Sequence, residues 1–135
     1  MILDTTFLID LMKDDPTAVK RLKEMEKDKI RQNIASPTLY ELYVGIMLSS
    51  KPEKEKRKVL DTLASMNILG LSAKSAAKAG EVQGKLIREG KMIDPEDAMI
   101  AGIALHNKEI VLTKNVEHFS RIRALITETY KKKQE

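Results

Sequence analysis

Short apolar runs alternate with longer segments of helical periodicity along this chain, and that alternation constrains the fold more than any other feature of the sequence. Strands that are separated by helical connections form parallel sheets, because a parallel pair needs a long crossover between its members. Such sheets carry helices on both faces. The sequence therefore predicts an α/β domain with an essentially parallel sheet. The expected strands are residues 1–3, 32–35, 67–71, 109–113 and 125–129.

Three aspartate or serine residues directly before proline indicate where helices begin, since the side chain caps the helix and the missing proline N–H costs nothing in the first turn. These pairs are Asp15-Pro16, Ser36-Pro37 and Asp94-Pro95. Ser72 is expected to cap another helix, which ends near Gly90 in a left-handed conformation. Within that helix, Gly80 and Gly84 predict a close backbone approach to another element. Residues 114–119 are expected to form a loop.

The length, charge and cysteine content of the chain exclude several classes of protein. Its 135 residues fit one domain, expected over residues 1–130, followed by a basic and disordered tail at 131–135. The absence of cysteine excludes disulfides and thiolate metal sites. A net charge of +4 permits a polyanionic partner. No apolar run reaches the roughly 20 residues of a membrane helix, and the acid at position four does not suit a signal peptide, so a cytoplasmic location is expected.

Carboxylates stand where a parallel sheet places functional side chains, which is beyond the carboxyl ends of its strands. Asp4 follows the first strand, Glu41 lies in the second turn of the helix after the second strand, and Asp97 begins a nearly all-apolar helix. Each residue also has an ordinary interpretation. These are, respectively, a helix cap, a solvated or ion-paired glutamate, and a capping box with Asp94. Taken together, the three predict an acidic site.

Converging carboxylates repel each other and raise one another's pKa unless a cation neutralises them. Mg²⁺ or Mn²⁺ suits a site made of carboxylate oxygens. Zinc would need histidine or cysteine ligands, and His106 and His118 have no ligand-like spacing. A bound divalent ion polarises a phosphodiester and lowers the pKa of an attacking water. The chain has no glycine-rich phosphate loop and no Ser-His-Asp grouping that would indicate other chemistry.

Four motifs extend this acidic pattern along the chain. They are Ile2-Leu3-Asp4-Thr5-Thr6, Ser36-Pro37-Thr38-Leu39-Tyr40-Glu41, Asp97-Ala98-Met99-Ile100-Ala101 and Val111-Leu112-Thr113-Lys114-Asn115. In this order and spacing the chain resembles PIN-domain proteins, and among them the VapC toxins of toxin–antitoxin pairs. The resemblance implies a three-layer α/β/α sandwich with an essentially parallel five-stranded sheet. It also implies a Mg²⁺- or Mn²⁺-dependent endoribonuclease that acts as the toxin of a VapBC-type pair.

The resemblance assigns roles to single residues. The catalytic and metal-binding positions are Asp4, Glu41 and Asp97. The supporting positions are Thr6, Thr113 and Asn115. Many relatives have an aspartate where this chain has Asn115, which puts a second metal ion in question. Asp94 or Glu117 could supply the missing carboxylate.

The resemblance further implies a homodimer and a small antitoxin that covers the acidic groove. A face with Tyr40, Tyr43, Val44 and Met47 is compatible with such a partner, and also with ordinary core packing. RNA binding requires cations because the catalytic edge is negative. The candidate cations are Lys51, Lys54, Arg57, Arg121 and Arg123.

Other functions remain open at this point. A housekeeping PIN nuclease in ribosomal RNA processing would use the same site. A catalytically weak PIN module would bind RNA without cleaving it. A phosphoacceptor domain that uses Asp4 is disfavoured, because no second aspartate stands two residues on.

Overall fold

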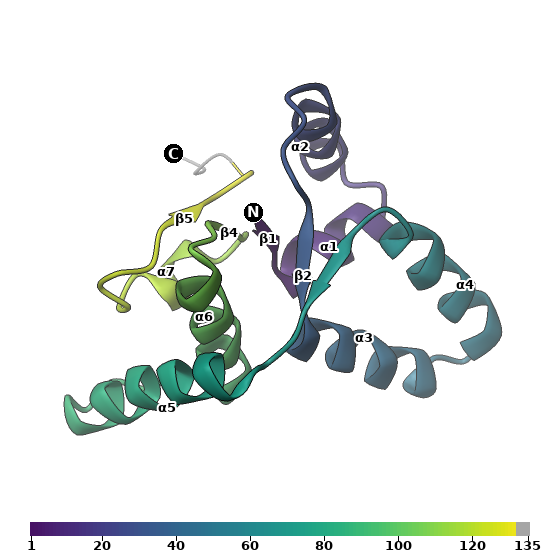
Figure 1. Cartoon of the computed structure of the whole chain (residues 1–135). Helices are drawn as coiled ribbons and strands as arrows, with labels where there is room; N and C mark the ends of the chain where they lie inside the picture. Colours follow the sequence, from purple (N-terminus) through teal and green to yellow (C-terminus); the bar gives the residue numbers. More distant parts are fainter. Residues whose placement is uncertain (132–135) are drawn as a thin grey trace.

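The computed structural model describes residues 1–131 and contains one five-stranded sheet in the order β3-β2-β1-β4-β5 (Figure 1). The strands are β1 (Ile2–Leu3), β2 (Asn33–Ala35), β3 (Asn67–Leu69), β4 (Val111–Leu112) and β5 (Thr127–Glu128). All neighbouring strands pair in parallel. Every strand lies inside a range expected from the apolar runs, so the predicted parallel sheet is confirmed.

Seven helices connect the strands within the described residues. They are α1 (Thr5–Met12), α2 (Pro16–Lys27), α3 (Ser36–Leu48), α4 (Pro52–Leu63), α5 (Ala73–Arg88), α6 (Pro95–Asn107) and α7 (Val116–Phe119). The short helix α7 replaces the expected loop, because one helical turn carries the Phe119 side chain into the core, where it is 1% exposed. Over residues 1–131, none of the helices has both the length and the apolar character that a membrane crossing requires.

Most helix boundaries follow the capping residues that the sequence indicates. The confirmed caps are Asp15, Ser72 and Asp94, whose side chains each accept a hydrogen bond from a first-turn backbone N–H. The expected cap at Ser36 is wrong: α3 begins at Ser36 itself, and Ala35 occupies the capping position. The Ser36 hydroxyl instead accepts a hydrogen bond of 3.1 Å from the backbone N–H of Leu71. This bond ties the start of α3 to the segment after β3.

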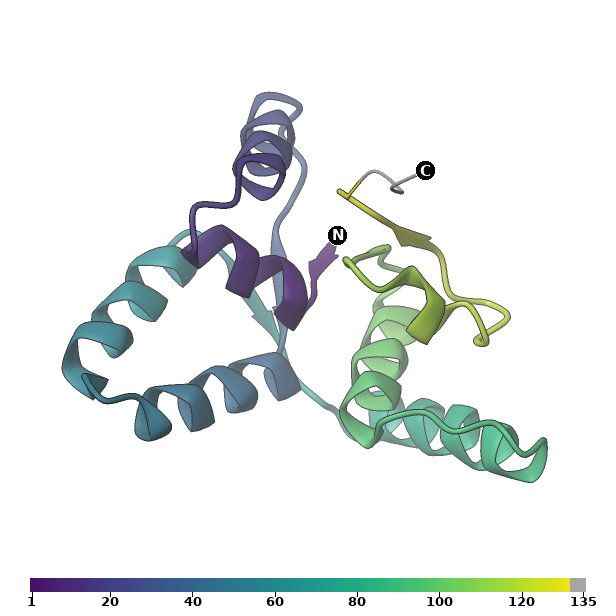
Figure 2. The same cartoon turned by 180° about the vertical axis from the view of Figure 1, so that it is seen from behind.

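The sheet divides the core into two layers, because successive strand residues point to opposite faces. Leu3, Ile34 and Leu112 pack with helices α1 to α4 on one face. Ile2, Ala35 and Val111 pack with helices α5 to α7 on the other. Both views of the molecule place these two groups of helices on opposite sides of the sheet (Figures 1 and 2). The expected three-layer α/β/α sandwich is therefore confirmed.

Helices α5 and α6 make the closest backbone approach, and it does not occur where the sequence predicted. A Cβ atom added at Gly102 of α6 would lie 2.5 Å from the carbonyl oxygen of Ser75 and 2.7 Å from the nitrogen of Ala79. The prediction that Gly80 and Gly84 approach another element inside the domain is wrong, since a Cβ at either position would meet nothing within 4 Å. Those two glycines lie on the exposed side of α5, whereas Ser75 and Ala79 form its buried side.

The strand order places a switch point between β1 and β4. From β1 the chain winds outward through β2 to β3, and it then returns to build β4 and β5 on the other side of β1. Open parallel sheets bind their ligands at such a point, beyond the carboxyl ends of the two strands. Here the backbone N–H of Asp4 donates to the carbonyl of Leu112 over 3.1 Å. The ends of β1 and β4 therefore lie side by side.

The end of the described chain packs against the first two helices. The ring of Tyr130 meets the ring of Phe7 edge to face, with 4.9 Å between centroids. The ammonium of Lys131 lies 2.7 Å from the carboxylate of Asp15. Lys131 was expected in the solvated tail and instead contacts the folded domain. The rest of that expected tail, residues 132–135, lies outside the described residues.

Candidate active site

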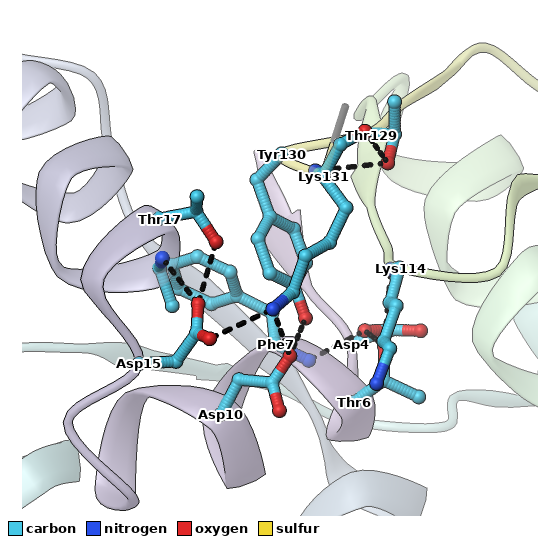
Figure 3. A network of polar contacts seen from close by, with 11 residues as sticks. Asp4, Thr6, Phe7, Asp10, Asp15, Thr17, Lys114, Thr129, Tyr130 and Lys131 are labelled. Carbon is cyan, nitrogen blue, oxygen red and sulfur yellow. Dashed lines mark hydrogen bonds and ion pairs between the residues drawn. The ribbon is translucent and has the colours of Figure 1, made fainter. Parts of the chain in front are cut away.

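Asp4 combines the capping role and the site role that the sequence left open. Its side chain caps α1 through a hydrogen bond of 3.1 Å from the backbone N–H of Phe7, and it accepts a second bond of 2.7 Å from the hydroxyl of Thr6 (Figure 3). The residue is 4% exposed. Burial raises the pKa of Asp4, and hydrogen bonds from Thr113, Thr6 and Phe7 partly oppose this. A carboxylate held in this way is rigid and sensitive to nearby charge.

The two supporting threonines connect Asp4 to the segment after β4. The hydroxyl of Thr6 accepts a hydrogen bond of 3.1 Å from the backbone N–H of Lys114 (Figure 3). Thr113 is fully buried, and its hydroxyl accepts a bond of 3.0 Å from the backbone N–H of Asn115. Asn115 precedes α7, and its side chain does not cap that helix. Thr6 and Thr113 thus surround Asp4, while the Asn115 backbone completes the turn.

Glu41 lies on α3 and faces α1. The hydroxyl of Thr5 donates a hydrogen bond of 3.0 Å to its carboxylate. Burial raises the pKa of Glu41 to about 7, and the neighbouring carboxyl of Glu96 adds to this through a shared hydrogen bond and its charge. The charge of Asp97 acts in the same direction. Glu41 is therefore a half-buried acid rather than a fully solvated one.

Glu96 is a site residue that the sequence did not single out. It stands between Pro95 and Asp97 in the first turn of α6, where an acid is ordinary because it suits the positive end of the helix dipole. Only the packing of α3 against α6 brings it to Glu41. The one available signal was its direct adjacency to Asp97.

Asp97 does not form the capping box that its spacing from Asp94 suggested. Asp94 caps α6 through a bond of 3.0 Å from the Glu96 backbone N–H. Asp97 instead lies 3.7 Å from the imidazole of His118. Burial and the charge of Asp94 raise the pKa of Asp97, and His118 opposes them. His118 is a surface residue, as expected, but one that faces the acidic group.

The charges of the predicted carboxylates act on one another. The charge of Asp4 raises the pKa of Asp97, and the charge of Asp97 raises that of Glu41. In the side-chain positions found over residues 1–131, no three or more Asp, Glu or His groups are close enough to hold one ion. The donor set is nevertheless oxygen-rich and negatively charged, which is the composition that Mg²⁺ or Mn²⁺ requires.

Two hollows contain acids of this group, and a third adjoins one of them. One is lined by Met92, Ile93, Asp94, Asp97, His118 and Arg121. It shares Arg121 with a larger hollow that also includes Lys85, Lys91 and Arg123. The other hollow that contains an acid lies between α1, α3 and α4 and includes Thr5, Glu41 and Lys58.

The candidate cations and the two candidate extra acids differ in their relation to these hollows. Arg121 and Arg123 line them, whereas Lys51, Lys54 and Arg57 are exposed on or beside α4 and line none of the three. Asp94 lies beside Asp97. Glu117 is exposed on α7 and contributes to none of these hollows.

This combination of sheet order, buried N-terminal aspartate and distant carboxylates defines a class of protein. The PIN domain family matches residues 1–125 of the chain. The chain belongs to the PIN-domain family.

Its relatives within that family are VapC proteins. A tRNA(fMet)-specific endonuclease VapC of Shigella flexneri is 31% identical over 129 residues, which cover 96% of each chain. Ribonuclease VapC2 of Haemophilus influenzae is also 31% identical, with the same coverage. A crystal structure of VapBC2 from Rickettsia felis, bound to a DNA fragment from their promoter, is similar with a TM-score of 0.88 and 29% identity. That similarity covers 95% of this chain and 96% of the other.

Proposed function

We propose that this chain is a VapC-type endoribonuclease, the toxin of a toxin–antitoxin pair. The observation that carries the proposal is that Asp4, Glu41 and Asp97 come from three distant segments of the chain and act on one another in sequence: the charge of Asp4 acts on Asp97, and the charge of Asp97 acts on Glu41. The names of the VapC relatives, a ribonuclease and a tRNA-specific endonuclease, support the same activity.

The site is proposed to hold Mg²⁺ or Mn²⁺ through Asp4, Glu41 and Asp97, directly or through water. A divalent ion bound there would polarise the scissile phosphodiester and lower the pKa of a water molecule. Thr6 and Thr113 orient the carboxylate of Asp4 through hydrogen bonds. Burial is the main cause that raises the pKa of each acid, and repulsion between carboxylates adds to it at Glu41 and Asp97. A bound cation would relieve that repulsion.

The missing aspartate at position 115 is best replaced by acids of α6. Asp94 and Glu96 both raise the pKa of Asp97, which means that their charges are felt at the site. Nothing comparable supports Glu117. We therefore assign Asp94 and Glu96 as the acids that add negative charge around the metal.

RNA is proposed to approach over the hollows that contain Arg121. Arg121 lines the hollow beside Asp97 and also the larger one with Lys85, Lys91 and Arg123. A phosphate chain in this path would pass basic side chains and then reach the carboxylates. The lysines of α4 provide the alternative path.

The exposed face of α3 is proposed to bind protein partners, a second copy of the chain or the antitoxin. Tyr40 is 64% exposed and Met47 is 76% exposed, so this face is not core. The related complexes from Rickettsia felis and Salmonella typhimurium are of VapBC, which supports an antitoxin partner. A cytoplasmic location accompanies this proposal, because both the RNA substrate and the antitoxin are found there.

The decisive experiment compares RNA cleavage by the wild-type chain and by Asp4→Asn in Mg²⁺ or Mn²⁺. Asparagine caps helices as well as aspartate does, so α1 is retained while the negative charge is lost. Cleavage is expected to fall by about 100-fold or more, and addition of EDTA to the wild type is expected to abolish it. Asp61→Asn, at an exposed acid on α4, is the matched control and should cleave normally.

Equal cleavage by Asp4→Asn and wild type contradicts the proposed site. Tight RNA binding without cleavage in Mn²⁺ would indicate the non-catalytic PIN module instead. Growth arrest on expression, relieved by a co-expressed antitoxin, separates the toxin from a housekeeping nuclease.

A further inference from the structure

Tyr130 contacts the first helix through both its ring and its hydroxyl. It follows β5 and is 9% exposed. Its ring packs edge to face on Phe7, and its hydroxyl donates a hydrogen bond of 2.6 Å to the carboxylate of Asp10. Both partners belong to α1. Figure 3 shows Tyr130 between Asp10 and Asp4, with its ring against Phe7.

Lys131 adds a second connection beside the first. Its ammonium lies 2.7 Å from Asp15, which caps α2, and 3.7 Å from Asp10 on α1. We call Tyr130 and Lys131 the C-terminal clamp. Asp10 is half-buried and has two partners, since it accepts from Tyr130 and lies near Lys131.

The helix held by this clamp is the one that positions Asp4. Phe7, which the Tyr130 ring contacts, donates its backbone N–H to the Asp4 carboxylate. Thr6 donates its hydroxyl to the same oxygen. One of the two groups that hold Asp4 therefore belongs to the residue against which the Tyr130 ring packs.

The hydroxyl of Tyr130 is a permanent donor. Burial and the Asp10 carboxylate raise the pKa of Tyr130 well above its ordinary value. The proton therefore stays on the tyrosine, and the bond to Asp10 keeps its direction at any physiological pH.

We infer that Tyr130 is a positioning residue for Asp4, which holds the first turn of α1 in the place that aims the carboxylate at the acidic site. Its expected effect on metal affinity and catalysis rests on the proposed function, but its effect on the Asp4 hydrogen bonds does not. A purely structural role would stabilise the whole domain without affecting those bonds selectively.

The test uses Tyr130→Phe, which keeps the ring against Phe7 and removes only the hydroxyl. The first readout is amide hydrogen exchange of the metal-free chain at Phe7 and Lys114, whose N–H groups bond to Asp4 and Thr6. Both amides are expected to exchange several-fold faster, while amides of α5 and α6 are unchanged. Asp10→Ala, which removes the acceptor, should reproduce this pattern.

The matched control is Arg21→Gln, which removes a polar connection between α2 and β5. Arg21 on α2 lies 3.3 Å from the carboxylate of Glu128. This variant loses a neighbouring connection of the same chain segment without removing the partners of Tyr130, so exchange at Phe7 and Lys114 should stay at the wild-type rate.

The second readout is Mn²⁺ affinity by calorimetry, together with kcat and KM for RNA cleavage. For Tyr130→Phe, Mn²⁺ binding is expected to weaken by about 10-fold, which is typical for loss of a group that orients a metal ligand. kcat should fall, whereas KM for RNA should not change.

Unchanged exchange at Phe7 in Tyr130→Phe, or an equal increase at every amide, overturns the inference. The wild-type chain could fail to bind Mn²⁺ and to cleave RNA while Tyr130→Phe still shows faster exchange at Phe7 and Lys114. The positioning of Asp4 by Tyr130 would then stand. That result would instead refute the proposed function.

Discussion

The contact of Gly102 with α5 leads to the most quantitative prediction about this molecule. Gly102 lies in the middle of α6, the helix that carries Asp97 in its first turn. Replacement by alanine adds one methyl group, which would point directly at the backbone of α5. The three nearest atoms are the Ser75 carbonyl oxygen and the nitrogen and Cβ of Ala79. None of them can move without moving α5 itself.

The magnitude follows from this overlap. Cβ atoms essentially never approach other heavy atoms within 3.0 Å, and here the nearest lies at 2.5 Å. Overpacking of a core by one such group costs about 1–3 kcal/mol. Alanine is favoured over glycine in a helix interior by about 1 kcal/mol, which offsets part of the cost. The added methyl meets backbone atoms of α5, so we expect the upper half of the overpacking range, about 2–3 kcal/mol. After subtraction of the gain of about 1 kcal/mol in helix propensity, the free energy of unfolding of Gly102→Ala is expected to fall by about 1–2 kcal/mol.

The assay is urea denaturation of the variant beside Gly80→Ala and Gly84→Ala. These two controls make the same chemical change in α5, where the added methyl meets nothing within 4 Å. The free energy of unfolding of each control is expected to rise by about 0.5–1 kcal/mol. The two controls should therefore be more stable than the wild type, and Gly102→Ala less stable. If Gly102→Ala were as stable as the wild type, or more so, the close approach of the two helices would be refuted.

Two further predictions concern the charges of the site. Burial and Glu96 raise the pKa of Glu41 from 4.5 to about 7, so the folded state holds a proton that the unfolded chain has lost between these values. The unfolding free energy of the metal-free chain should fall as pH rises through this window, and it should fall less in Glu96→Gln. Urea titrations at several pH values measure it. An unfolding free energy that stays constant or rises between these pH values contradicts the prediction. Arg121→Gln should weaken RNA binding and reduce its salt dependence by about one counterion, whereas Lys54→Gln should do neither. The reverse result in filter-binding titrations would move the RNA path to α4.

Local signals in the sequence were sufficient for the elements and for part of the site. The apolar runs predicted all five strands. The three central strands β1, β2 and β4 are buried, whereas the edge strands β3 and β5 are partly exposed. Asp15, Ser72 and Asp94 predicted their helix starts, since a capping bond joins residues only two or three positions apart. Asp4 could be placed at the carboxyl end of the sheet's strands because it directly follows β1.

Contacts between distant segments were not readable in the same way. Ser36 has the sequence of a cap, yet its hydroxyl bonds to the N–H of Leu71 from the segment after β3. The spacing of Gly80 and Gly84 suggested a packing face, but α5 meets α6 through Ser75 and Ala79, which lie against Gly102. Residues with ordinary local roles gave no signal of their long-range partners.

The sequence by itself determined that the chain is an α/β domain with acids after its strands, since apolar periodicity and helix caps act over a few residues. Only the tertiary structure decided that Glu96 reaches Glu41, that His118 faces Asp97, and that the clamp at the chain end holds the helix of Asp4. The physical reason is that burial and charge depend on every segment that packs around a side chain. The strand order of the whole sheet determines which segments pack together, and the residues next to a side chain in the sequence do not.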